Sequence, residues 1–103
     1  MANVFLGTEL KLSISVDPIG GFKFSDYDCT VDIYTTHTKV VSIPKSRLIK
    51  VDDNTYIACV ETKQLGVGRV KCRISAYIPD GDFEGDKRRT EVCIVDTGIN
   101  IIG

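Results

Sequence analysis

Segment 80–91 carries the clearest chemical pattern in the chain, a run of closely spaced acidic side chains. Counted from Asp80, acidic residues occupy positions 1, 3, 5 and 12, and a glycine occupies position 6. This spacing nearly reproduces the loop in which EF-hand proteins surround Ca²⁺ with oxygen ligands. The candidate calcium ligands are therefore Asp80, Asp82, Glu84 and Glu91.

The same segment also carries features that oppose a calcium site. Three consecutive basic residues, 87–89, stand inside the loop and would repel a cation. The flanking residues alternate like strands, whereas an EF-hand loop joins two helices. We therefore interpret the segment as a solvated hairpin loop and expect no bound metal or cofactor. A calcium-dependent adhesion or carbohydrate-binding module is the alternative function that these residues leave open.

Catalysis and nucleic-acid binding have weaker support in the sequence. His37 is the single histidine, and no phosphate-binding glycine loop, G-x-S-x-G or HExxH motif accompanies it. Arg69, Lys71 and Arg73 share one face of a predicted strand, but 14 acidic residues balance the 13 basic ones. A dedicated nucleic-acid binder usually has a basic excess. We predict a non-enzymatic chain that does not bind nucleic acid, with a small hydrolase using His37 as the alternative.

The four cysteines and the lack of long apolar runs bear on the compartment. The longest apolar runs hold three or four residues, far short of the ~20 that a membrane-spanning helix needs, so we expect no membrane partner. The start also lacks the pattern of a signal peptide, which favours a reducing compartment and free thiols. No CxxC motif indicates a zinc site. Cys29 and Cys72 both lie on apolar strand phases, and a bridge between them across a sandwich is the alternative.

The composition favours strands as the elements that position these residues. The chain has 103 residues, of which 32 are Val, Ile or Thr and only 8 are Ala or Leu. β-Branched residues suit a pleated sheet. Alternating or apolar segments separated by turn signals are found at about 10–16, 27–36, 39–43, 47–51, 56–61, 69–78, 89–95 and 99–102. The pattern predicts an all-β fold, an antiparallel immunoglobulin-like β-sandwich of about seven strands in a single domain, 1–103.

The pairing of segments 69–78 and 89–95 decides which apolar side chains lie outside. If Ile78 lies opposite Thr90, Val92 and Ile94 face the core. Tyr77, Cys93 and Val95 then lie on the opposite face, where two apolar side chains would need cover. We therefore include these three residues among the candidate interface residues.

Both ends of the chain are also rich in apolar residues. The remaining interface candidates are Val4, Phe5, Leu6, Ile99, Ile101 and Ile102. A domain of this size struggles to bury so much apolar surface alone, which favours packing against another subunit. The alternative is that one terminus adds an edge strand to its own sheet.

Several of these segments resemble a known class of small proteins. The resemblance rests on MANVFLGT at the start and on segments 25–28, 49–56, 62–68, 76–80 and 89–92. Together they resemble small immunoglobulin-like modules of tailed phages and prophages of gut bacteria, including crAss-like phages. More loosely, they resemble the N-terminal sandwich of phage baseplate upper proteins. The motifs are turn and strand patterns that cover almost the whole chain and carry no catalytic signature.

The resemblance implies a structural role in a phage particle. A protein of this class would be a head fibre, a capsid decoration or a tail or baseplate subunit. Its partners would be other capsid or tail proteins and copies of itself, with a trimer favoured. It would be located in the virion after assembly in the bacterial host cytoplasm, which agrees with free cysteines. The resemblance supplies no functional residue that transfers by position.

Overall fold

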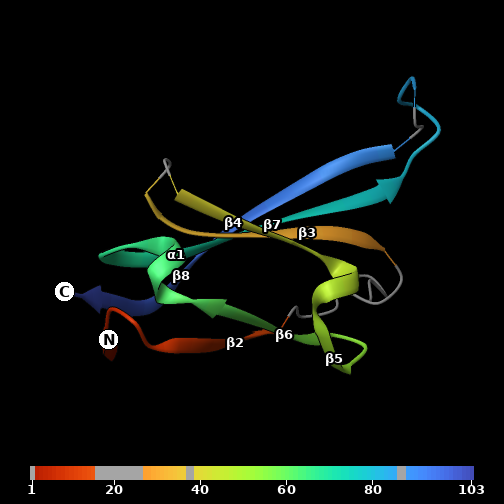
Figure 1. The fold of residues 1–103 in the computed structure, drawn as a ribbon. Helices are drawn as coiled ribbons and strands as arrows, with labels where there is room; N and C mark the ends of the chain where they lie inside the picture. Colours follow the sequence, from red (N-terminus) through yellow and green to blue (C-terminus); the bar gives the residue numbers. More distant parts are fainter. Residues whose placement is uncertain (1, 16–26, 37–38, 86–87) are drawn as a thin grey trace.

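The computed structural model describes residues 2–15, 27–36, 39–85 and 88–103, and within them eight strands form two stacked sheets (Figure 1). The strands are β1 (Ala2–Phe5), β2 (Glu9–Ser15), β3 (Asp28–Thr36), β4 (Lys39–Pro44), β5 (Ile49–Asp52), β6 (Thr55–Glu61), β7 (Gly68–Pro79) and β8 (Arg88–Ile102). The short helices η2 (Lys45–Arg47) and α1 (Thr62–Leu65) connect strands. The predicted all-β sandwich is confirmed, with one strand more than expected.

The strand order is that of the immunoglobulin fold. The larger sheet has the order β1-β8-β7-β3-β4, and the smaller has the order β2-β6-β5. In immunoglobulin notation, β2, β6 and β5 take the places of strands B, E and D, while β8, β7, β3 and β4 take those of G, F, C and C′. All pairs are antiparallel except β1 with β8, which run parallel.

The core follows from the alternation of apolar and polar residues. In β2, Leu12 and Ile14 are buried, and Ser13 between them is exposed. In β3, Val31 and Ile33 are fully buried on the face opposite the polar residues. Because successive side chains of a strand point to opposite faces, one face of each sheet meets the other sheet. The buried cluster consists of Leu12, Ile14, Cys29, Val31, Ile33, Ile43, Leu48, Tyr56, Ala58, Val60, Leu65, Val70, Cys72 and Ile101.

Helix α1 carries the chain from the smaller sheet to the larger one. Thr62 is fully buried, and its hydroxyl oxygen accepts a 2.7 Å hydrogen bond from the backbone N–H of Gly7. At the other end, the Thr35 hydroxyl donates to the carbonyl oxygen of Leu65, also at 2.7 Å. Gly66 ends the helix with φ at +81°, a left-handed conformation that suits glycine. Both sheets are thereby joined to one turn of helix.

The two ends of the chain pair with each other. The observed arrangement is therefore the alternative in which one terminus adds an edge strand to its own sheet. Strand β1 adds to the sheet edge with Val4 opposite Ile101, and the N–H of Leu6 donates to the carbonyl oxygen of Ile102. Ile101 is fully buried in the core, so its predicted place on an exposed surface is wrong. Val4 and Ile99 pack against the same core. Ile102 is half-buried.

The β7–β8 pairing differs by one residue from the predicted register. Ile78 lies opposite Arg89, not Thr90, so Ile74 faces Cys93 and Arg73 faces Ile94. A shift of one residue exchanges the two faces of a strand. Cys93 and Val95 therefore share a face with the core residues of β7, whereas Val92 and Ile94 lie on the outer face.

The cysteines are free, as expected, and the alternative bridge between Cys29 and Cys72 is not formed. Both cysteines belong to the larger sheet, on the adjacent strands β3 and β7. Cys29 lies opposite Ala76, and Cys72 lies opposite Ile33, so the two thiols are separated along the strands. All four cysteines are free thiols.

Candidate interaction surface

The first half of β8, residues 88–96, contains an apolar stretch, 92–95, that is exposed on both faces. Val92 and Ile94 are 57% and 62% exposed on the outer face, beside Ser75 and Arg73 of β7. On the other face, Cys93 is exposed and Val95 is 45% exposed. Figure 1 shows the reason: β7 and β8 rise away from the layer formed by β2, β5 and β6. The smaller sheet therefore does not cover this part of the hairpin.

The same segment also has an open backbone edge. Strand β8 has β7 on one side along most of its length, but β1 on its other side pairs only with residues 99–102. Among the described residues, no strand pairs with that side of 88–96. Unpaired N–H and C=O groups along an edge can accept another strand. Exposed apolar side chains and an open edge thus coincide in one segment, which we call the open half of β8.

A bulge separates this open half from the buried end of the strand. Between Lys71 opposite Asp96 and Arg69 opposite Asn100, β8 has three residues where β7 has one. Gly98 lies in the bulge with φ at +74°, and the Thr97 hydroxyl donates to the carbonyl oxygen of Val70 at 2.8 Å. Bulges bend strands and increase their local twist. The bulge therefore marks the point where the hairpin turns away from the sandwich.

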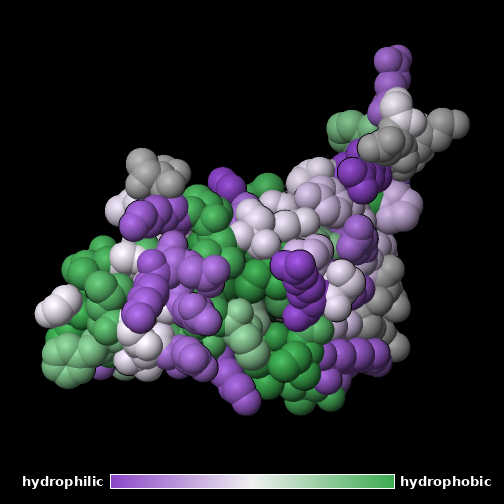
Figure 2. Space-filling view, in the orientation of Figure 1, coloured by the Kyte–Doolittle hydropathy of each residue, from purple (hydrophilic) through white to green (hydrophobic). Residues whose placement is uncertain are grey.

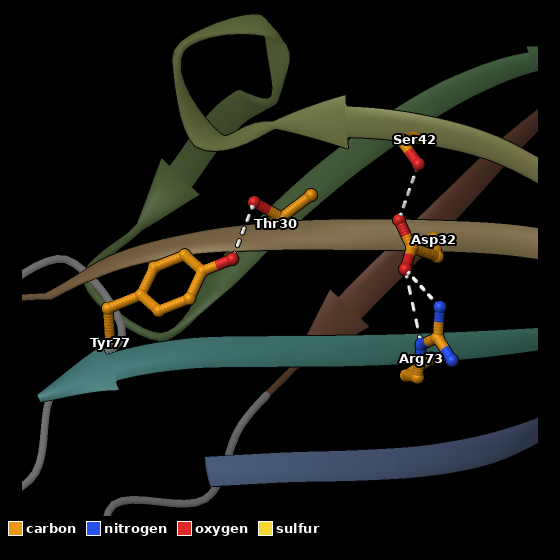
Figure 3. A network of polar contacts seen from close by, with 5 residues as sticks. All are labelled: Thr30, Asp32, Ser42, Arg73 and Tyr77. Atoms are coloured by element: carbon orange, nitrogen blue, oxygen red, sulfur yellow. Dashed lines mark hydrogen bonds and ion pairs between the residues drawn. The ribbon is translucent and has the colours of Figure 1, made fainter. Parts of the chain in front are cut away.

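The outer face of the larger sheet is polar in its centre (Figure 3). The Asp32 carboxylate accepts hydrogen bonds from the Ser42 hydroxyl at 2.7 Å and from the Arg73 guanidinium at 2.7 and 3.1 Å. Partial burial raises the pKa of Asp32, but the hydrogen bonds from Ser42 and Arg73 and the charge of Arg73 together lower it by more, so the net shift is downward. This network links β4, β3 and β7 and ends at β7.

The basic stripe considered for nucleic-acid binding is largely paired with acidic groups. Arg73 binds Asp32, and Arg69 lies 2.7 Å from an oxygen of Asp96. The pKa of the Asp96 carboxyl is lowered most by the hydrogen bond from the backbone N–H of Gly98 and next by the hydrogen bond from the Arg69 side chain. Because the guanidinium groups of Arg69 and Arg73 are already paired with carboxylates, they are less available for contacts with phosphate groups.

The candidate calcium ligands are not gathered into one site. Asp80 accepts a hydrogen bond from the N–H of Asp82 at 3.1 Å. The Arg89 guanidinium lies 3.3 Å from Glu91 and 3.9 Å from Asp80, so a cation of the protein already stands between these carboxylates. Glu84 is exposed on the loop. In the described part of the chain, no cluster of three potential metal ligands is found. His37 lies outside the described residues.

Tyr77 and the N-terminal candidates have different surroundings. The Arg88 guanidinium lies 4.4 Å from the centre of the Tyr77 ring, and the Tyr77 hydroxyl is 3.4 Å from that of Thr30. The Tyr77 side chain therefore contacts Arg88 of the same hairpin and Thr30 of the neighbouring strand β3. Phe5 and Leu6 stay exposed, with Val67 also exposed near that end of the fold. Figure 2 shows hydrophobic side chains gathered at the end where both termini lie.

The cysteines divide into two buried and two exposed thiols. Burial raises the pKa of both Cys29 and Cys72 to about 11. Cys59 and Cys93 are exposed, one in the smaller sheet and the other in the open half of β8. Because the thiolate is the reactive form, only the exposed pair is suited to chemical labelling at neutral pH.

Sequence reasoning missed Val92 and Ile94 as surface residues. The signal that could have found them is the absence of any polar phase in 92–95, where all four residues are apolar. A half-buried strand shows polar residues on one face, whereas this segment shows them on neither.

Comparisons with protein families, with curated proteins and with solved structures found no match to this chain. The fold itself defines an immunoglobulin-like β-sandwich. In the described residues, no helix has the length and apolar character required to cross a membrane.

Proposed function

We propose that this chain is a structural subunit of a phage virion and acts by protein–protein assembly. The open half of β8 is the observation that carries the assembly role, because it joins exposed apolar side chains to an unpaired backbone edge. Burial of apolar surface and addition of a strand are the two common ways in which such a segment binds another protein. The resemblance to phage immunoglobulin-like modules supports the virion as the place of assembly.

The arrangement of charges supports the same mode of action. Asp32 and Arg73 bind each other, as do Arg69 and Asp96. Their charges are therefore used to hold strands together. The neighbouring Val92 and Ile94 have no such cover among the described residues. The rest of the sandwich provides a rigid support that presents this segment, as immunoglobulin-like folds present loops and edges.

Mass spectrometry of purified particles tests the virion role. Particles would be purified on a density gradient from the host that encodes the chain. We expect the chain at a fixed ratio to the major capsid or tail protein. Replacing Val92 and Ile94 together by Lys should reduce incorporation, because charges on an edge oppose strand addition. Absence of the wild-type chain from purified particles would overturn the proposal.

A matched control uses another exposed apolar pair. Ile49 and Val51 on β5 are 51% and 57% exposed, close to the values for Val92 and Ile94. The double variant Ile49→Lys and Val51→Lys adds the same charge to the other sheet. We expect its incorporation to match the wild type, whereas an equal loss in both variants would contradict a specific role for the open half of β8.

A further inference from the structure

We propose that the open half of β8 pairs with the same segment of a second copy of this chain, as antiparallel strands around a two-fold axis near Cys93. This inference rests on the proposed assembly function, since it names the partner at that surface. Pairing would join two five-stranded sheets edge to edge into one continuous sheet.

The backbone edge is long enough to accept a strand, and its centre lacks the residues that usually block strand addition. It extends from Arg88 to the point where β1 begins to pair at Ile99. Proteins usually protect such an edge with lysine, proline or a covering loop. Residues 92–95 are Val-Cys-Ile-Val and have none of these residue types. The edge is therefore suited to strand addition along its centre.

The charges at its two ends favour a second copy in the antiparallel direction. The segment begins with Arg88 and Arg89 and ends with Asp96. An antiparallel copy brings the basic end of each strand toward the acidic end of the other. A parallel copy in register would instead place like charges opposite each other, which destabilises a sheet. The antiparallel direction is therefore the one that avoids this repulsion, although Arg89 and Asp96 also contact Glu91 and Arg69 of their own chain.

The apolar residues set the register. A two-fold axis perpendicular to the sheet keeps each side chain on its own face, so only residues of the same face can lie opposite each other. With the axis at Cys93, Val92 lies opposite the partner's Ile94, and Ile94 lies opposite the partner's Val92. Each Cys93 then lies opposite its counterpart. An axis at Val92 would instead oppose Ile94 to the partner's Thr90, which loses apolar contact. An axis at Ile94 would place the start of the partner's strand opposite residues 99 and 100, which already pair with β1.

Of the other edge strands, β5 is less suited to this role. Strand β5 has four residues, and its pairing with β6 contains a register shift between Lys50 and Asp52. Short and irregular edges are typical of strands that do not pair further. The two-fold at β8 also closes on itself, so we expect a dimer where the resemblance favours a trimer.

Thiol cross-linking tests the register. In the Cys59→Ser variant, a short bismaleimide should join two chains through Cys93 at concentrations where the dimer forms. In the Cys93→Ser variant, Cys59 remains exposed on the other sheet, and we expect little cross-linked dimer. Equal cross-linking through Cys59 and Cys93, or none through Cys93, would overturn the register.

Sedimentation velocity over a range of concentrations tests the dimer itself. The wild-type chain should show a monomer–dimer equilibrium, and the Val92→Lys, Ile94→Lys variant should weaken it at least about tenfold. The Ile49→Lys, Val51→Lys variant should dimerise like the wild type. Circular dichroism checks that both variants stay folded, as expected for exposed positions. A wild-type monomer at all concentrations, or a dimer unaffected at β8, would refute self-pairing.

The two proposals fail in different ways. If the chain is incorporated into virions but stays monomeric in solution and does not cross-link through Cys93, the assembly function stands and self-pairing is wrong. If the chain dimerises through β8 but is absent from purified particles, self-pairing stands and the virion role is wrong.

Discussion

The two halves of β8 differ in cover although each contains a cluster of apolar residues. Residues 99–102 pair with β1 on one side, and Ile101 is fully buried under the smaller sheet. Residues 88–96 pair with β7 alone, and Ile94 is 62% exposed. One continuous strand thus contributes to the core at one end and to a candidate interface at the other. The exposure of Val92 and Ile94 follows from the neighbours of the strand, since β1 pairs only with the other end and the smaller sheet does not extend to this one.

The centre and the margin of the larger sheet differ in the same way. Between β3 and β7, Asp32 and Arg73 form a charge-assisted contact that spans the pair. Between β7 and β8, the residue opposite Arg73 is Ile94, which has no polar group to offer. The polar network therefore fixes the central strands, while the open half of β8 keeps side chains that gain most by contact with another protein.

The largest expected effect comes from shortening one side chain to alanine at each end of β8 and comparing the two losses of stability. Ile101→Ala removes a fully buried side chain and should lower the free energy of unfolding by about 2–5 kcal/mol, from lost burial and the cavity left behind. Ile94→Ala should change it by less than about 0.5 kcal/mol in the monomer. Urea denaturation at low protein concentration measures both. Similar losses for the two variants would contradict the contrast.

Thiol reactivity compares a buried and an exposed cysteine on neighbouring strands. The pKa of Cys72 is raised from 9.0 to about 11 by burial, which lowers its thiolate fraction about 100-fold before access is considered. Cys93 should react with iodoacetamide while the protein is folded, together with Cys59. Mass spectrometry should find two labelled cysteines in the native protein and four after unfolding. Early labelling of Cys72 or Cys29 would argue against the packed core.

The Asp32 network gives a smaller effect with a defined dependence on pH. Partial burial raises the pKa of Asp32, but the hydrogen bonds from Ser42 and Arg73 and the charge of Arg73 together lower it below 3.8, so the ionised carboxylate stabilises the folded state. This contribution is complete above pH 3.8 and disappears as the pH falls through the folded-state pKa. Asp32→Asn should cost about 1 kcal/mol at pH 7, and the cost should shrink below about pH 4.

The matched control for Asp32 is Asp96, which borders the open half of β8. Its side chain is 45% exposed beside Arg69, so Asp96→Asn should have a smaller effect at pH 7. Thermal unfolding followed between pH 3 and pH 7 compares the two variants. A cost for Asp32→Asn that does not depend on pH would argue against the ionic contact.

An effect of about the same size is expected at the bulge that separates the two halves. Gly98 has φ at +74° and nothing near its position for a β-carbon, so Gly98→Ala would add only backbone strain, about 1 kcal/mol. Gly81 also has open space but no positive φ in this range. Gly81→Ala should therefore be near neutral. Equal unfolding midpoints for both variants would show that the bulge does not require glycine.

The sequence was sufficient for most strands but insufficient for their register. It did not place a strand at Ala2–Phe5, and it divided β8 into two segments. Segment 10–16 alternates strictly, and its apolar residues Leu12 and Ile14 are buried in β2 as expected. In 92–95 both phases are apolar, so alternation cannot distinguish a pairing of Ile78 with Thr90 from one with Arg89. Register is poorly specified wherever neither face is polar. The apolar character of both phases of 92–95 therefore leaves the register undetermined by the sequence, and it also gives the exposed apolar surface.

The candidate surface could be predicted only in part. Cys93 and Val95 were expected to be exposed and are, although they share the core face of β7, and the smaller sheet does not extend beneath them. The burial of Ile101 depends on the parallel pairing of two termini that are distant in sequence. Likewise, Cys29 and Cys72 lie in one sheet because β3 and β7 are neighbours, which periodicity alone does not reveal. Such long-range neighbours require the topology.

Hydrogen–deuterium exchange along β8, measured at low and high protein concentration, tests the central claim most directly. At low concentration, amides in 99–102 should be protected, and those amides of 88–96 that point away from β7 should exchange rapidly. At high concentration, the same amides of 88–96 should become protected, with no change in 99–102. Equal protection of both halves at low concentration, or no gain in 88–96 at high concentration, would contradict the account.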